Sequence, residues 1–210
     1  MLVKFFNSVI PKYLNLRCDA GKLEDTVYWS MSSSTYEAWE PLLQARKLLG
    51  EPVAHGSEPD IILVFDSQVV LIEAKFMSPA VVRTDSVPAY YMENSEHPVF
   101  NDTIKATTDC IGYELFRYFL LGEQLAKLLN RPYIVVSLTR SVGESGLEDR
   151  ITPSLRSEQH CFRHITWDQV GKFAREHMDS VECAILSRYL SEKTAGYDQN
   201  GKLQLLIPDA

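Results

Sequence analysis

The sequence predicts a three-layer α/β fold in which a mixed central β-sheet is flanked by helices. Segments 60–65 and 68–76 are apolar and are separated by only two turn-forming residues, which is typical of a β-hairpin. An amphipathic helix is expected over 109–130, and a third apolar segment, 133–138, follows it. A strand, a helix and another strand in this order form a crossover that makes a parallel pair of strands.

The length and composition are those of one soluble globular domain. The chain has 210 residues, of which 45% are hydrophobic and 23% charged, and no repeat or linker divides it. We expect a single domain over 1–210, with a core at about 33–139 and a C-terminal helical extension at about 166–193. Polar residues interrupt the apolar N-terminus before a signal peptide or a membrane span is complete, so the expected location is the cytoplasm.

The first core helix is expected to begin in the polar run 32–35 and to end at Gly50. Ser34 and Glu37 fit a capping box at its start. Pro41 lies inside the helical pattern, so the helix is either kinked there or begins anew at that residue.

The hairpin should lie in the centre of the sheet, because both of its strands are too apolar for a half-exposed position. Patterns elsewhere are weaker. Residues 1–31 fit no single element, and residues 140–160 are polar and irregular. Residues 78–105 are expected to form a long loop that could cover a site. A helix is expected to start at Thr166 or Asp168 and to run to about Lys193, and residues 203–207 are expected to form a short final strand.

The hairpin brings three functional side chains together. A two-residue turn at positions 66 and 67 places Asp60 directly opposite Glu73. Period-two alternation places Lys75 on the same face of the sheet. Two acids side by side in an apolar sheet would repel each other and lose hydration, unless a divalent cation neutralises them or one is protonated.

A hard ion such as Mg²⁺ suits this arrangement because it takes carboxylate oxygens and keeps waters, one of which can become a nucleophile. Lys75 would position or deprotonate that water, or stabilise the charge that grows on phosphorus. An assembly of this kind hydrolyses phosphodiesters.

The residues Pro59-Asp60 and Glu73-Ala74-Lys75 resemble the PD-(D/E)xK motif of the restriction-endonuclease-like nuclease superfamily. The resemblance covers residues 33–139, and the segments Ser33 to Leu42 and Tyr113 to Gln124 are similar to those of uncharacterised bacterial members. It implies a three-layer restriction-endonuclease-like fold with helix, strand, hairpin, helix and strand in that order. It also implies that Asp60, Glu73 and the backbone carbonyl of Ala74 bind Mg²⁺ or Mn²⁺ and that Lys75 is catalytic.

Two further positions are candidates by the same resemblance. Family members often place another acid on the first core helix, where Glu37 flanks the apolar side and Glu40 points nearly opposite. Glu37 is therefore the better metal ligand, although a capping role is an equal alternative. Gln124 lies on the helix after the motif, where a Gln or Lys sometimes contacts substrate; a plain helix surface is the competing interpretation.

The (D/E)xK pattern also has a purely structural interpretation, in which Glu73 and Lys75 are a solvated ion pair on an edge strand. The apolar sequence on both sides favours an active site instead. His160 and His164, beside Cys161, have a spacing that can hold zinc on a helix, but no second ligand pair accompanies them, so we expect no zinc site and ordinary buried thiols.

The expected function is metal-dependent cleavage of nucleic acid, with DNA as the first candidate substrate and RNA as the second. The net charge of −7 means that phosphate binding needs a local basic face, a homodimer or a partner subunit. The alternatives are a catalytically inactive nuclease-fold module that binds nucleic acid or a protein, and an acidic structural subunit. Neither a membrane nor a pathway is indicated.

Overall fold

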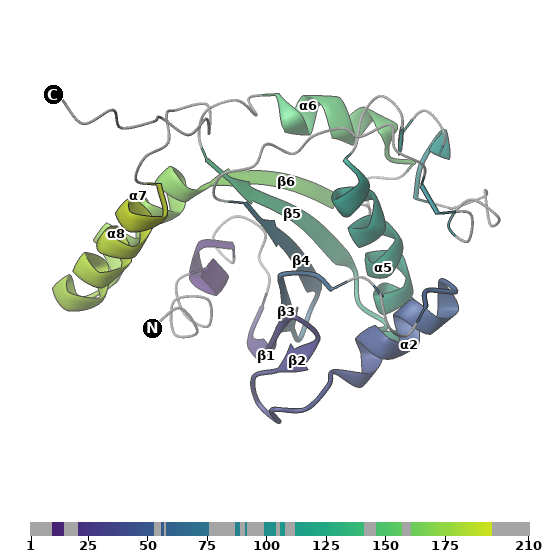
Figure 1. Cartoon of the computed structure of the whole chain (residues 1–210), viewed down its shortest axis with the longest axis horizontal. Helices are drawn as coiled ribbons and strands as arrows, with labels where there is room; N and C mark the ends of the chain where they lie inside the picture. Colours follow the sequence, from purple (N-terminus) through teal and green to yellow (C-terminus); the bar gives the residue numbers. More distant parts are fainter. Residues whose placement is uncertain are drawn as a thin grey trace, which may run out of the picture.

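A six-stranded sheet with helices on both faces forms the molecule, which confirms the predicted α/β class (Figure 1). The structure is a computed structural model that describes residues 10–14, 21–52, 56, 58–75, 87–88, 91, 99–103, 106–107, 112–140, 146–156 and 161–194. The strands are β1 (Leu23–Tyr28), β2 (Met31–Ser32), β3 (Ile61–Phe65), β4 (Val69–Ala74), β5 (Tyr133–Thr139) and β6 (Cys161–Thr166), in the spatial order β2-β1-β3-β4-β5-β6. The helices are α2 (Glu40–Leu48), α5 (Tyr113–Leu129), α6 (Leu147–Ile151), the 3-10 turn η3 (Thr152–Ser154), α7 (Trp167–His177) and α8 (Ser180–Thr194).

The predicted hairpin is the centre of the sheet. Strands β3 and β4 pair antiparallel with Ile61 opposite Ile72 and Leu63 opposite Val70, which is the register that a two-residue turn requires. Strand β4 pairs with β5 in parallel, with Ile72 beside Val136. Both the register and the parallel crossover therefore agree with the prediction.

The two faces of the sheet pack against different helices. On one face Ile62 and Leu71 lie in a core with α2 and α5. On the other face Ile61 and Ile72 lie in a second core with residues 10–14, α7 and Leu186 of α8. Figure 1 shows the corresponding layers, with α2 and α5 on one side of the strands and α7 and α8 on the other. Burial on both faces explains why residues 61–65 and 69–72 of the hairpin are all apolar.

The start of the first core helix differs from the prediction. Helix α2 begins at Glu40, with Trp39 as its N-cap and Pro41 in its first turn. A proline fits the first turn of a helix, where its missing N–H has no helical partner to lose. Of the two alternatives for Pro41, the new start is therefore the observed one, and the predicted capping box of Ser34 and Glu37 is wrong.

The serines before α2 bind Asp25 instead of capping the helix. The Asp25 carboxylate accepts hydrogen bonds from Ser32 Oγ at 2.6 Å, Ser33 Oγ at 3.2 Å and the backbone N–H of Ser34 at 3.2 Å. It also accepts one from the N–H of Thr26 at 2.8 Å. A loop organised around one partly buried acceptor replaces the expected first turns of helix.

Other elements were absent from the prediction or had different bounds. Strand β1 lies within the unassigned 1–31 region, and β2 extends from its last residue to Ser32. Helix α6 and η3 lie within the segment expected to be irregular, and β6 precedes the last helices. The expected final helix is two helices, because Met178 has extended backbone between α7 and α8. Its predicted start is right, since Thr166 caps α7 in a capping box with Gln169.

Two predictions concern regions that the structure describes little or not at all. The expected strand at 203–207 lies outside the described residues, and so does most of the 78–105 loop. Within the described ranges, none of the helices is both long and apolar enough to cross a membrane.

Candidate active site

Asp60, Glu73 and Lys75 lie at one end of the central hairpin, on the face that α2 and α5 cover. Their neighbours Ile61 and Ile72 pack into the core on the opposite face. Because side chains alternate along a strand, Asp60, Glu73 and Lys75 are directed toward α5. The predicted convergence of two carboxylates and one amine is therefore present in the backbone geometry.

The carboxylate of Asp60 is held in place by the adjoining strand. Its Oδ2 accepts a hydrogen bond from the N–H of Ala74 at 2.8 Å, and the side chain of Trp29 also bonds to it. Partial burial raises the pKa of Asp60, and the neighbouring charge of Glu73 raises it further, against the lowering effects of the Ala74 N–H, Lys75 and Trp29. A cation bound at this carboxylate would relieve both of the unfavourable effects.

The ammonium group of Lys75 lies between two carboxylates. Its Nζ is 3.1 Å from Oε1 of Glu73 and 3.5 Å from Oε1 of Glu114, which is in the first turn of α5. Burial lowers the pKa of Lys75, but Glu73 and Glu114 together outweigh that effect, so the pKa is raised. Lys75 is an ammonium ion in this arrangement.

The backbone of Lys75 is fixed on two sides. Its N–H donates to the carbonyl of Leu138 at 2.8 Å, which extends the β4–β5 pairing by one residue. Its carbonyl accepts a hydrogen bond from Nε1 of Trp167 at 3.2 Å. The side chain that carries the amine therefore starts from a rigid position at the end of a central strand.

Tyr118 connects both acids to α5. Its hydroxyl accepts a hydrogen bond from the backbone N–H of Asp60 at 3.1 Å and is also hydrogen-bonded to Glu73. Burial is the main cause that raises the pKa of Tyr118, and the charges of Glu73 and Asp60 add to it. The phenol thus keeps its proton, which it can donate to Glu73 while it accepts from Asp60.

The donors present fit a hard divalent ion through two carboxylates and one backbone oxygen. In a strand the N–H and C=O of one residue point to the same side, so the carbonyl of Ala74 faces the side on which its N–H meets Asp60. Mg²⁺ commonly uses only one or two carboxylates and completes its shell with water and substrate phosphate. Among the described residues, no three His, Cys, Asp or Glu side chains form a group that could hold a metal. A metal bound in this part of the chain would therefore need ligands other than side chains alone.

Three sequence candidates do not join this site. Glu37 is exposed in the segment beside β2, which β1 and β3 separate from β4. Glu40 begins α2 and accepts a hydrogen bond from Gln44 at its exposed surface. Gln124 lies ten residues after Glu114 on α5, which is about 15 Å farther along the helix axis.

The structure adds Glu114, Tyr118 and Trp29 to the site. Glu114 and Tyr118 are spaced i, i+4 at the start of α5, and in a β-α-β crossover the start of the helix lies near the end of the preceding strand. This spacing is a signal in the sequence, although the resemblance points to Gln124 on the same helix instead. Trp29 carried no such signal, because the strand before it had not been recognised.

Polar side chains continue from the site across the next two strands. Ser137 of β5 pairs with Glu73 and with His164 of β6. The side chain of Ser137 is only 1% exposed, and its Oγ has no hydrogen-bond partner in the described part of the chain. Thr139 Oγ1 lies 2.8 Å from Nε2 of His164. Because His164 is in a strand, the helical spacing considered for zinc does not apply, and His160 lies outside the described residues.

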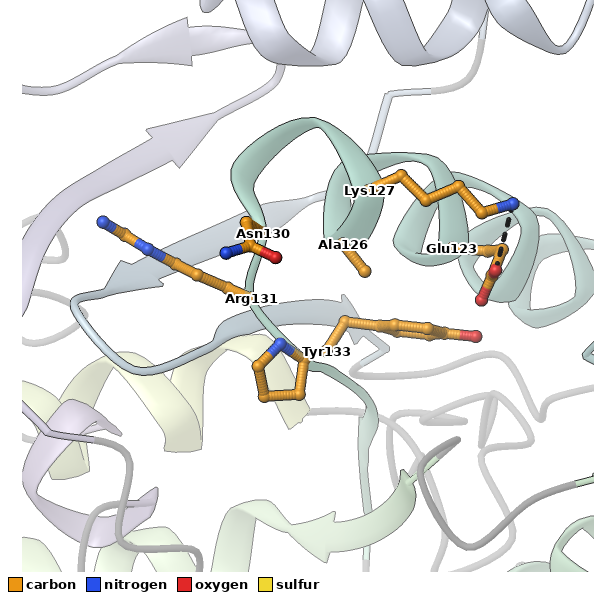
Figure 2. A pocket seen from close by; sticks show the side chains of 7 residues that line it. Glu123, Ala126, Lys127, Asn130, Arg131 and Tyr133 are labelled. Carbon is orange, nitrogen blue, oxygen red and sulfur yellow. Dashed lines mark ion pairs between the residues drawn. The ribbon is translucent and has the colours of Figure 1, made fainter.

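A pocket of about 530 Å³ lies elsewhere, where α5 ends and β5 begins. Figure 2 shows the residues lining it, which include Tyr133 and an ion pair of 3.1 Å between Lys127 and Glu123. Since α5 runs antiparallel to its flanking strands in a crossover, this pocket is at the opposite edge of the sheet from Asp60. The only acidic side chain that lines this pocket, Glu123, forms an ion pair with Lys127. The two carboxylates at Asp60 and Glu73 therefore make the hairpin the better candidate for a metal site.

Compared with models of known protein families, with curated proteins and with solved structures, the chain shows no significant match.

Proposed function

We propose that this chain is a metal-dependent nuclease that hydrolyses phosphodiester bonds, with DNA as its first candidate substrate. The observation that carries the proposal is the meeting of Asp60, Glu73 and Lys75 on one face of the central hairpin, beside a backbone carbonyl. The PD-(D/E)xK pattern of the sequence supports the same reaction class. A purely structural ion pair would not need a second buried acid beside it.

Each residue has a role that follows from its contacts. Asp60, Glu73 and the carbonyl of Ala74 would hold Mg²⁺ or Mn²⁺, which when bound supplies an activated water and neutralises phosphate charge. The ammonium of Lys75 can donate to a phosphate oxygen as negative charge grows there, since it already faces the carboxylates of this site. Attack by water on phosphorus then breaks the bond to the leaving oxygen, which takes up a proton.

Glu114 and Tyr118 act as positioning residues in this proposal. Glu114 forms an ion pair with the Lys75 ammonium from the α5 side, in addition to the ion pair that Lys75 forms with Glu73. Tyr118 fixes the spacing of Asp60 and Glu73 through one hydroxyl. Preorganised donors of this kind lower the barrier because they do not have to reorient during the reaction.

The experiment is a thermal-shift titration with Mn²⁺ beside cleavage assays on single-stranded DNA, duplex DNA and RNA. Mn²⁺ should raise the melting temperature of the wild type, since a ligand at 100 times its Kd stabilises the native state by about 2.7 kcal/mol. Asp60→Asn should lose both the shift and the cleavage. Asp66→Asn is the matched control, because Asp66 lies at the exposed turn of the same hairpin, where its carboxylate accepts a hydrogen bond from the N–H of Lys22.

A non-catalytic nuclease-fold module is the second candidate, favoured by the internal pairing of the site. Lys75 already has two carboxylate partners, and Asp60 already accepts from Ala74. Such a module would bind nucleic acid or a protein without cleaving and without responding to Mn²⁺. Absence of both cleavage and metal stabilisation in the wild type would replace the nuclease proposal with this one.

A further inference from the structure

Trp29 is a large aromatic side chain exposed beside the candidate active site. It lies in the turn between β1 and β2, and its side chain is 66% exposed. Tyr28 of β1 pairs with Ile61 of β3 in antiparallel register, so Trp29 and Asp60, the next residues of the two strands, are neighbours. The indole N–H, which is a donor only, lowers the pKa of the Asp60 carboxyl. An aromatic face is therefore presented to solvent in direct contact with a proposed metal ligand.

The backbone of this turn is unfavourable for a tryptophan. Trp29 and Ser30 have φ of 44° and 71°, the combination that a two-residue hairpin turn needs at both central positions. Gly, Asn or Asp normally occupies such positions because a larger side chain is strained there. The carbonyl of Ser30 accepts from the N–H of Trp39 at 2.8 Å, which holds the turn in place. An exposed Trp at a strained position gains little packing energy that would account for it.

We infer that Trp29 stacks on a nucleobase next to the bond being cleaved, and that the substrate at this site is therefore an unpaired nucleotide. The inference rests on the proposed nuclease function and names its substrate class. The bond to Asp60 places the indole within reach of a base attached to a phosphate at that site. In a duplex both faces of a base are covered by its neighbours, so stacking on an indole requires a single strand or a base outside the helix.

The charge of the chain agrees with this mode of binding. A net charge of −7 offers little general attraction to phosphates, which supplies most of the affinity of duplex-binding proteins. Stacking on an aromatic side chain adds affinity without neutralising a phosphate, and it is tolerant of base identity. An acidic protein therefore suits binding to a single strand better than binding to a duplex through its phosphates.

Tyr36 provides a matched control for Trp29. It is also an exposed aromatic residue at a positive φ, with 82% exposure and φ of 59°, but it lies beyond β2, where its N–H donates to the carbonyl of Ser32. Glycine at either position should relieve the backbone strain. Only the change at Trp29 should remove a stacking partner from the active site.

The test measures binding of a labelled single-stranded oligonucleotide in the presence of Mn²⁺, in a Lys75→Met background that prevents cleavage. Trp29→Gly should weaken binding about tenfold or more, Trp29→Phe should retain most of the affinity, and Tyr36→Gly should leave it unchanged. The difference in affinity between the parent with Trp29 and the Trp29→Gly variant should vanish on an oligonucleotide of abasic sites. Melting temperatures of both glycine variants should equal or exceed that of the parent.

Three results would overturn the inference: unchanged binding in Trp29→Gly, an equal loss in Tyr36→Gly, or a much lower melting temperature of Trp29→Gly, which would make Trp29 a structural residue. If the wild-type chain, with Lys75 present, cleaves DNA or RNA and any of these results is found, the stacking role is rejected and the proposed nuclease function stands. No cleavage and no binding by the unmodified chain would remove both.

Discussion

Tyr118 shows how much of the site depends on a single atom. Its hydroxyl is buried, accepts from the N–H of Asp60 and bonds to Glu73. Removing that oxygen leaves the backbone N–H of Asp60 without this acceptor and leaves Glu73 with Lys75 but without Tyr118. Leaving a buried polar group unsatisfied costs about 1–3 kcal/mol, which is more than the net value of an ordinary hydrogen bond.

We predict that Tyr118→Phe lowers the free energy of unfolding by about 1–3 kcal/mol and also weakens Mn²⁺ stabilisation. The second effect follows because Asp60 and Glu73 lose the group that fixes their spacing. Tyr133→Phe is the control, since Tyr133 is buried on the same face of the sheet but at its far edge. Urea denaturation and the Mn²⁺ titration measure the two effects. An unchanged metal response in Tyr118→Phe would refute the positioning role.

At this scale the sequence predicts the residues of the hairpin but not those that contact it from elsewhere. Asp60, Glu73 and Lys75 follow from turn length and alternation, which are local properties. The partnership of Glu114 with Lys75 depends on where a helix packs, 39 positions later in the chain. The position of Trp29 in the site depends on the pairing of β1, and no local sequence pattern predicts that pairing.

At the scale of elements, the loop before α2 is held by one aspartate. Asp25 accepts from two serine hydroxyls and two backbone N–H groups. This loop follows the β1–β2 turn that contains Trp29 and leads into α2, which covers the face of the candidate site. Its stability therefore affects both the aromatic side chain and the helix layer.

Asp25→Ala should lower the free energy of unfolding by about 2–3 kcal/mol, because hydrogen bonds to a charged acceptor contribute more than neutral ones. Asp66→Ala, which removes an exposed carboxylate that accepts from Lys22, should cost less than about 1 kcal/mol. Chemical denaturation of both variants gives the comparison. Equal losses would show that the serine loop is not organised by Asp25.

The contact of α5 with β5 requires a glycine. A Cβ built at Gly122 would lie 2.2 Å from Cδ2 of Tyr133, whose ring is buried. We predict that Gly122→Ala destabilises the protein by about 1–3 kcal/mol, although Ala is the better helix former by up to about 1 kcal/mol.

Tyr133→Leu should relieve the clash at Gly122, so the double variant should be more stable than the sum of the two single changes predicts. A double-mutant cycle measured by denaturation checks this. Stabilisation by Gly122→Ala alone would mean that α5 does not approach β5 as closely as the structure has it.

The elements that the sequence did not predict are those that tertiary pairing creates. Strand β1 contains Glu24 and Asp25 and has partly exposed positions, while β2 has only two residues. The last strand, β6, has only two buried positions, Phe162 and Ile165, and they are three residues apart, so it lacks the alternation of a half-exposed strand. By contrast, β3, β4 and β5 are buried along almost their whole length, and their apolar runs are sufficient to predict them as strands.

At the scale of the whole molecule, the parallel crossover places the candidate site at one edge of the sheet. The fold class followed from the order of strand, helix and strand, since this order restricts the topology strongly. The same order brings the start of α5 to the end of β4, where Lys75 meets Glu114. The pocket at the end of α5 lies at the other edge and shares none of these residues.

We propose that Lys75 is catalytic at a site where Asp60 and Glu73 hold the metal. The most direct measurement is the cleavage rate of wild type and Lys75→Met at saturating Mn²⁺, on whichever nucleic acid the wild type cleaves. We predict a loss of about 100-fold or more, the size expected for removal of one charged donor to a transition state, with the Mn²⁺ thermal shift retained. Cleavage by Lys75→Met at the wild-type rate would contradict the account.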